Sequence, residues 1–453
     1  MSYLSATEAV RLMTARELSP VELLEAVIAR AGEVENVINA FTEELYDSAM
    51  AQARIAETAY LRRTARPLEG IPVAVKEEQP IVGLTHEEGS LLLKGTIAEV
   101  THPVVTRIVR AGGIVHARTT TPEFSCAAFT HSKLWGVTRN PWNPAFSPGG
   151  SSGGSGASLA AGTSLLATGS DIGGSIRIPA SFCGVVGYKP PFGRVPALPP
   201  FNLDQYCHDG PMARTVADCA LLQNVIAGPH PWDVVSLRPK LELPPLTGDV
   251  RGMRIALSLT LGDYLVEPDI LDNTRRAAEA LRSAGAIVEE VTLPWTRELI
   301  MRAADAHFAG IFGAGIDDDE LLCDYTRAFR AIRPELSFHQ GLELEGELYR
   351  PLGELLERYD ALLCPTSAVP AFPAEHDGGP LEVAGESGPY MLGVMTVPFN
   401  IASRCPVISV PSGRASNGIP TGVQVVGRTY DDETVFQVAQ ALEGALAPLG
   451  HPL

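Results

Sequence analysis

Apolar side chains recur at helical spacing through the first sixty residues. Residues 5–60 are therefore predicted to be mainly helical. One helix is predicted to begin at Ser19, because Pro20 suits the first helical position and Glu22 follows within the first turn. The apolar residues after this start keep the helical period: Val21, Leu24 and Ile28.

Beyond residue 60, short apolar runs alternate with helical segments. Strands are predicted at 70–76, 114–117, 164–168, 253–257, 286–292, 361–364, 407–410 and 422–427. Helices are predicted at 100–112, 156–162, 268–284 and 431–446, with a charged helical stretch over 294–350 and irregular chain at 139–156 and 169–181. Such alternation predicts an α/β fold, in which helices cover a sheet.

Composition narrows the classes of function. Hydrophobic residues make up 45% of the 453 residues, which is ample material for a large buried core. The formal net charge of −18 repels phosphate backbones and anionic lipids, so we expect neither nucleic acid nor a membrane as partner. The seven cysteines form no Cys-x-x-Cys pair and no zinc-site spacing, and the N-terminus has no apolar signal core. We therefore expect a cytoplasmic protein with reduced cysteines, no metal and no cofactor.

The segment 149–155, Gly-Gly-Ser-Ser-Gly-Gly-Ser, is the first candidate for chemistry. It matches the Gly-x-Ser-x-Gly elbow of α/β-hydrolases, but that elbow needs a strand directly before the serine. Pro144 and Pro148 precede it here, and proline does not fit a sheet interior. A flexible linker is the other interpretation, and the short length and aromatic flanks of the segment argue against it.

The segment 169–180, Gly-Ser-Asp-Ile-Gly-Gly-Ser-Ile-Arg-Ile-Pro-Ala, is the second candidate. Consecutive glycines let backbone N–H groups converge, and such a nest beside Ser175 is what an oxyanion hole needs. Asp171 and Arg177 are spaced to pair and brace the turn, although an ordinary turn with a salt bridge has the same pattern. Lys76 is the third candidate, either as a solvated strand end or as a buried lysine that acts as a base.

A lysine, then a Gly/Ser-rich loop, then a Gly-Gly-Ser-Ile-Arg segment follow one another along the chain, and this combination resembles the amidase signature family. The resemblance extends from the N-terminal helices to residues 420–427, and it is most specific over 149–190. It implies the amidase-signature fold, a large mixed twisted β-sheet with helices on both faces. It also implies one amidase domain, with an N-terminal helical segment (about 1–60), a signature core (about 70–195) and a more variable helical region (about 294–350).

The resemblance also implies a role for individual residues. Lys76 matches the family's base, Ser151 matches a proton-relay serine that follows a cis peptide bond, and Ser175 matches the nucleophile that forms an acyl-enzyme. The oxyanion-hole segment corresponds to Ile172, Gly173, Gly174 and Ser175, and the supporting residues correspond to Ser152, Asp171 and Arg177. Residues after Pro122 line the family's acyl pocket, so Ser125 and Cys126 are expected to bind substrate, with plain packing as the alternative.

A lysine base must lose a proton that an ordinary lysine keeps until about pH 10.4. Burial in an uncharged pocket makes this loss easier, and the uncharged stretch 140–170 is predicted to form such a pocket around Lys76. The departures from the family pattern, such as Glu77 where aspartate is common, fall outside the three catalytic positions. These departures are expected to affect the substrate pocket and not the catalytic chemistry.

The predicted function is hydrolysis of a C–N amide bond in a small molecule, a linear non-peptide amide, with carbamoyl or urea-type compounds as further possibilities. A homodimer is also expected from the resemblance. One alternative is the amidase subunit of a tRNA-dependent amidotransferase, which works with partner subunits. Those subunits typically carry threonine in place of Ile172, and Asn-Met-Asp-Glu-Phe in place of the Thr-Thr-Pro-Glu-Phe at 120–124. A catalytically inactive binding or scaffold protein is the second alternative, and the three occupied catalytic positions argue against it.

Overall fold

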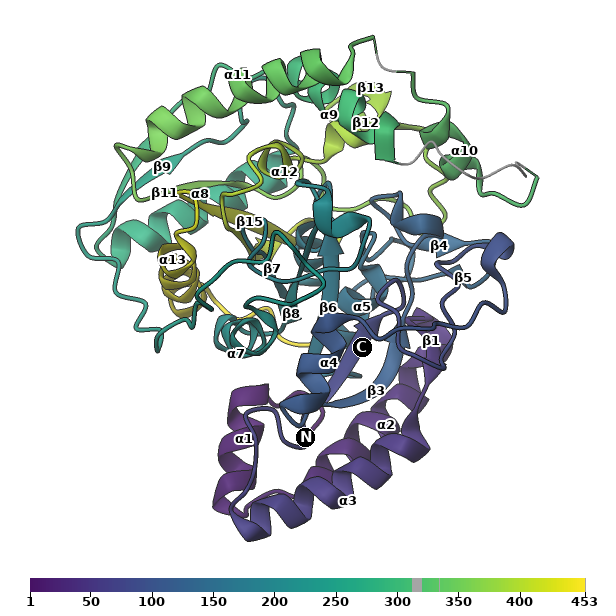
Figure 1. The fold of residues 1–453 in the computed structure, drawn as a ribbon. Coiled ribbons are helices and arrows are strands. Elements are labelled where there is room, and N and C mark those ends of the chain that lie inside the picture. The colour runs from purple at the N-terminus through teal and green to yellow at the C-terminus, as the bar shows by residue number, and fades with distance from the viewer. Residues whose placement is uncertain (312–319, 334, 453) are drawn as a thin grey trace.

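The computed structural model describes residues 1–311, 320–333 and 335–452, and one mixed sheet of eleven strands runs through it (Figure 1). In sheet order the strands are β1 (Phe41–Glu44), β3 (Ile114–Thr119), β2 (Pro72–Lys76), β6 (Leu166–Asp171), β8 (His208–Ala213), β7 (Val186–Lys189), β14 (Val407–Arg414), β15 (Pro420–Gly427), β11 (Ala361–Pro365), β9 (Arg254–Leu257) and β10 (Ile287–Glu290). Two small sheets pair β4 (His131–Ser132) with β5 (Gly136–Val137), and β12 (Pro380–Val383) with β13 (Glu386–Pro389). The predicted α/β class with a large mixed sheet is confirmed.

Helices cover both faces of the large sheet. One face carries α1 (Ala6–Ala15), α4 (Pro103–Arg110), α7 (Val216–Ile226), α8 (Pro268–Ser283) and α13 (Asp432–Ala445). The other face carries α5 (Gly153–Ala161), α6 (Arg177–Cys183), α9 (Arg297–Ile311), α11 (Phe338–Leu356) and α12 (Pro398–Ile401). Both faces need a cover because successive side chains of a strand point to opposite faces of the sheet, as strand β6 shows. Leu166 packs into the apolar cluster of the first face and Ala167 into that of the second.

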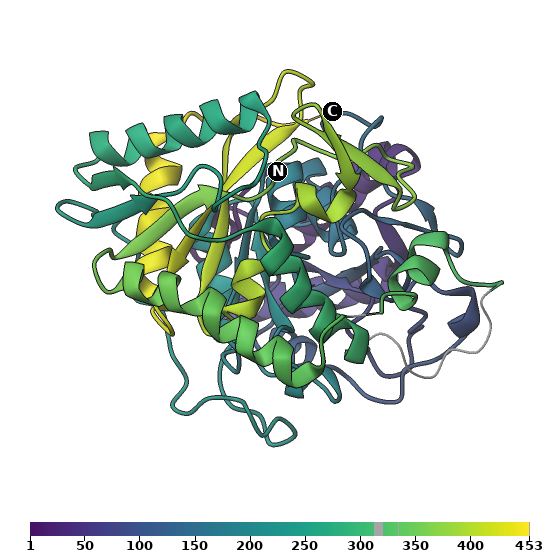
Figure 2. The ribbon, with the colours of Figure 1, turned by 90° about the horizontal axis from the view of Figure 1, so that it is seen from above.

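The remaining helices lie toward the ends of the sheet. Helices α2 (Pro20–Ile38) and α3 (Tyr46–Arg62) pack on each other near β3, and α10 (Asp324–Arg330) follows α9 along the chain. Helices α9 and α11 run side by side, as the view from above shows (Figure 2). Short 3₁₀ helices are η1 (Leu91–Leu93), η2 (Glu123–Ser125), η3 (Phe201–Leu203) and η4 (Tyr390–Gly393). None of the described helices is long and apolar enough to cross a membrane.

The predicted helix start at Ser19 is confirmed as a full capping box. The Ser19 hydroxyl accepts from the backbone of the first turn, and the Glu22 carboxylate accepts from the Ser19 backbone N–H at 2.9 Å. The expectation of helix over 5–60 holds only in part, since β1 interrupts it and pairs antiparallel with β3. The predicted helical region 294–350 contains α9, α10 and most of α11, while its residues 312–319 and 334 lie outside the described part of the chain.

The largest errors of the sequence prediction lie between residues 169 and 213. Helix α6 occupies part of the segment that was predicted to be irregular, and strands β7 and β8 were not predicted. Strand β8 contains Gly210 and Pro211, which are unfavourable in isolated strands. It forms because it lies between β6 and β7 and pairs antiparallel with both of them. Long-range pairing therefore outweighs local propensity here.

Strand order brings the candidate residues together. Strands β2 and β6 are parallel neighbours, with Val73 opposite Leu166 and Ala74 opposite Ala167. The carboxyl ends of parallel strands lie at the same edge of a sheet, and the residues that follow them form a common crevice. Lys76 ends β2 and Asp171 ends β6, so the two sequence motifs meet at this edge.

Candidate active site

The Lys76 side chain is fully buried and its Nζ atom lies among three oxygens. It donates to Ser151 Oγ at 2.7 Å and to Ser170 Oγ at 2.8 Å, and it lies 2.6 Å from Glu78 Oε2. An ammonium group has three protons, so these three acceptors satisfy all of them. The expected proximity of Lys76 and Ser151 is therefore observed, in an arrangement that suits the protonated lysine.

The predicted uncharged pocket around Lys76 is wrong, because Glu78 provides a carboxylate there. Burial opposes ionisation of Glu78, but the Lys76 charge and the hydrogen bonds from Lys76, Ser170 and Ser125 outweigh it and lower the pKa of this carboxyl. Sequence analysis overlooked Glu78. A signal was available, because two consecutive glutamates follow directly after a lysine that ends an apolar run.

Ser151 lies two residues before helix α5, and the Gly150–Ser151 peptide bond is cis. Gly150 has no room for a side chain, since a Cβ atom would lie 2.4 Å from the carbonyl oxygen of Phe129. Ser152 ties this segment to its neighbours: its N–H donates to the carbonyl of Ser175 at 3.1 Å, and its hydroxyl donates to the carbonyl of Ser170 at 3.3 Å. The Gly/Ser-rich loop is thus a tightly packed turn and no linker.

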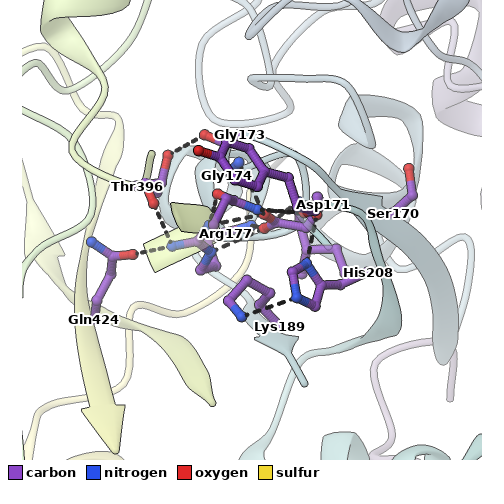
Figure 3. Close-up of polar contacts among 12 residues, drawn as sticks. Ser170, Asp171, Gly173, Gly174, Arg177, Lys189, His208, Thr396 and Gln424 are labelled. Atoms are coloured by element: carbon purple, nitrogen blue, oxygen red, sulfur yellow. Dashed lines mark hydrogen bonds and ion pairs between the residues drawn. The ribbon is translucent and has the colours of Figure 1, made fainter. Parts of the chain in front are cut away.

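The Asp171 carboxylate organises the turn that carries Ser175 (Figure 3). It accepts from the backbone N–H of Gly174 at 2.9 Å and from that of Ile176 at 3.2 Å. It also accepts from the Arg177 guanidinium at 2.8 and 3.0 Å, and both side chains are fully buried. The predicted pairing of Asp171 with Arg177 is confirmed. Arg177 and the hydrogen-bond donors lower the pKa of Asp171 against the effect of burial, so the carboxylate stays ionised.

The turn is fixed from the opposite side by Thr396, whose hydroxyl donates to the carbonyl of Gly173 at 2.6 Å. Gly174 adopts φ +124°, and a Cβ atom there would lie 1.9 Å from the Thr396 hydroxyl oxygen. Only glycine fits this position. The close approach holds the backbone of the turn in one conformation.

Backbone donors of the turn are available for a ligand. Within the described part of the chain, the N–H groups of Ile172, Gly173 and Ser175 donate to no protein group. The Gly174 N–H differs, because Asp171 already accepts from it. Three converging donors beside a serine can stabilise a negatively charged oxygen.

Ser175 itself lies at a cavity with its side chain largely buried, at 7% exposure. Its hydroxyl forms no hydrogen bond with any described residue, so the expected link between Ser151 and Ser175 is not formed in this conformation. Catalytic hydrogen bonds are often long in a free enzyme and tighten only when substrate binds, so Ser175 stays the candidate nucleophile.

The cavity at Ser175 is mainly apolar. Ser125 and Cys126 line it, as expected from their place after Pro122. Ile172 and Gly173, from the predicted oxyanion-hole segment, line it too. Its other walls come from residues that sequence analysis did not assign to the site: Ala127, Ala128, Ile178, Phe308, Phe329, Tyr390 and Met391. Every lining side chain that the structure describes is uncharged, so the cavity suits an uncharged, apolar group.

A second, acidic cavity lies beside Glu78. Carboxylates of Glu78, Glu88 and Asp209 line it, together with His86 and His102. Burial and the neighbouring Glu78 carboxylate raise the pKa of Glu88 to about 8 and that of Asp209 to about 7. Among the described residues, no group of three His, Cys, Asp or Glu side chains is arranged to hold a metal ion.

Asp209→Asn is expected to remove part of the pH dependence of stability. The pKa of Asp209 in the folded protein lies above its ordinary value. Its contribution to the free energy of unfolding is therefore complete at low pH and is lost as the pH rises through about 7. Between pH 6 and 8 the wild type should lose about 1.4 kcal/mol of unfolding free energy relative to the variant. Urea unfolding at both pH values measures this difference, with the exposed Asp272→Asn as control. A difference that stays constant over this range would contradict the prediction.

Comparisons with known proteins find similar sequences and structures over nearly the whole chain. The family model described as Amidase matches residues 22–318 and 326–436. A glutamyl-tRNA(Gln) amidotransferase subunit from Chloroflexus aurantiacus is 34% identical and covers 98% of this chain and 96% of its own length. Among solved structures, a bacterial aryl acylamidase of the amidase signature family has a TM-score of 0.91 at 29% identity, covering 100% of this chain and 99% of its own. A 6-aminohexanoate cyclic dimer hydrolase has a TM-score of 0.87 at 30% identity, with the same coverage.

Proposed function

The chain belongs to the amidase family, and from this premise we propose that it hydrolyses the C–N bond of a small amide whose acyl group is apolar. One observation carries the proposal: a buried lysine contacts Ser151 beside the turn in which Ser175 and three free backbone donors face a cavity. This combination supplies a base, a relay and a nucleophile with an oxyanion site.

In the proposed mechanism, Lys76 in its neutral form accepts a proton from Ser151, which takes one from Ser175. The Ser175 oxygen then attacks the amide carbonyl, and backbone N–H groups of Ile172, Gly173 and Ser175 stabilise the oxyanion. The proton returns through Ser151 to the leaving amine, and the C–N bond breaks. Water then hydrolyses the ester on Ser175 by the reverse proton path.

Ser151 must contact two partners in this scheme, because its hydroxyl donates to Lys76 while it accepts from Ser175. It already contacts Lys76 Nζ at 2.7 Å, and the scheme requires the contact with Ser175 to form when substrate is bound. Ser152, Asp171 and Arg177 act by holding the two loops in place, through the hydrogen bonds described above. The Gly174 N–H supports the turn rather than the oxyanion, since it is bonded to Asp171.

The amidase subunit of a tRNA-dependent amidotransferase is the second candidate, because relatives at 34% identity are named as subunits of a glutamyl-tRNA(Gln) amidotransferase. Such a role would require partner subunits and glutamine as the amide donor. The cavity favours the first candidate, since glutamine carries an ammonium and a carboxylate that need charged partners when buried. The described lining offers it none.

We expect kcat/KM for an aryl amide of an apolar acid to exceed that for glutamine by at least about 100-fold, because the cavity has no charged partner for the glutamine head group. Release of aniline and of ammonia measures the two reactions on the same preparation. Faster glutamine hydrolysis, or activity that appears only when amidotransferase partner subunits are added, would contradict the first candidate and support the second.

A further inference from the structure

One oxygen of Glu78 joins the catalytic lysine to the substrate cavity. Oε2 lies 2.6 Å from Lys76 Nζ and accepts hydrogen bonds from Ser170 at 2.7 Å and from Ser125 at 2.8 Å. Ser125 lines the cavity at Ser175, whereas Glu78 itself faces the acidic cavity. Glu78 therefore separates the two cavities and contacts Lys76 between them.

The contacts of Nζ show what Glu78 does to the lysine. Neutral Lys76 has two protons and one lone pair, so it can serve Ser170 and Glu78 as donor and still accept from Ser151. Glu78 and Ser170 hold Nζ in the position where its remaining site points to Ser151. The negative charge on Glu78 has a second effect, because it stabilises the protonated lysine, which cannot act as a base.

We propose that Glu78 is a positioning residue that holds Lys76 against Ser151 and sets the pH above which Lys76 acts as a base. This inference rests on the proposed function. The β2 strand and the turn after it thus supply both the base and the carboxylate that controls its proton.

Other titratable groups face the same place and define the control. Glu88 and His86 come from the loop after β2, Asp209 and Cys207 come from β8 and the residue before it, and His102 precedes α4. None of these side chains has a hydrogen bond or ion pair with Lys76 among the described residues. A direct contact therefore distinguishes Glu78 from its acidic neighbours, of which Glu99 is exposed and Glu88 is one-quarter exposed.

The test follows the rate of labelling by a fluorophosphonate serine probe between pH 5.5 and 10. In the wild type the rate should rise with pH as Lys76 loses its proton. In Glu78→Gln, which keeps the shape and removes the charge, this rise should move to lower pH by about 1–3 pH units. In Glu88→Gln, which removes a carboxyl without contact to Lys76, the rise should stay within about 0.5 pH unit of the wild type.

A structural role alone would lower the plateau rate of Glu78→Gln and leave the position of the rise unchanged, and that outcome would overturn the proposal. Complete loss of labelling in a folded Glu78→Gln would also overturn it, because Glu78 would then be the proton acceptor itself. If Glu78→Gln does not fold, Glu78→Ser serves the same purpose, as the side chain is one-fifth exposed. A wild type that is not labelled at Ser175 refutes the proposed function instead, so the two failures are distinguishable.

Discussion

Replacing Ser175 with alanine is expected to lower amide hydrolysis by at least about 10⁴-fold, because the substitution removes the atom that attacks the carbonyl. Labelling by a fluorophosphonate probe should disappear with it. The fold should be unaffected, since the Ser175 hydroxyl has no hydrogen bond among the described residues. Hydrolysis of an aryl amide and the thermal midpoint, measured on the same preparation, check both parts of this prediction.

Ser181→Ala is the matched control for this substitution. Ser181 lies in α6, is buried at 2% exposure and does not line the cavity at Ser175. Its replacement should leave labelling within about two-fold of the wild type. Unchanged labelling in Ser175→Ala would place the nucleophile elsewhere, and the Gly/Ser-rich loop 149–155 would be the next segment to test.

Replacing Arg177 with methionine is expected to destabilise the protein by about 3–5 kcal/mol, because it leaves the buried Asp171 carboxylate without its countercharge. The guanidinium also donates to Gln424 at 2.7 Å, to Asn400 at 2.7 Å and to the carbonyl of Thr396 at 3.0 Å. All of these acceptors are buried, so the loss extends beyond one ion pair. Urea unfolding at pH 7 measures the change.

An exposed pair gives the control for Arg177. Arg251 pairs with Asp249 at 2.7 Å, but its side chain is 80% exposed, and Arg251→Met should cost less than about 1 kcal/mol. The two variants would have equal effects if burial did not matter, and that result would contradict the prediction. Because the pKa of Asp171 lies below its ordinary value, its contribution is present above about pH 4 and is lost only as the pH falls further.

Local sequence signals predicted much of the fold correctly. The capping box at Ser19 and Glu22 depends on residues three positions apart, and the structure contains it. The run that ends at Lys76 forms β2, as its apolar residues predicted. Strand β8 was missed because its Gly210 and Pro211 weaken the local signal, and pairing with β6 and β7 stabilises the strand.

The candidate site was likewise predicted correctly in one part and missed in another. The motifs identified Lys76, Ser151 and Ser175, and the structure brings Lys76 into contact with Ser151 and places Ser175 at a cavity nearby. Their catalytic roles stay predictions that the labelling experiments test. The charge around Lys76 was predicted wrongly, because spacing along the chain does not show that Glu78 turns back toward Nζ.

By itself, the sequence determined the α/β class and the family, and it indicated Lys76, Ser151 and Ser175 as candidates for the chemistry, because periodicity, caps and glycine-rich turns are local properties. Only the tertiary structure decided which groups surround them. Phe308, Phe329 and Tyr390 form walls of the cavity at Ser175 although they lie far from it along the chain. Their position depends on strand order and helix packing, which no local pattern encodes. The same packing decides that Lys76 is buried beside the carboxylate of Glu78.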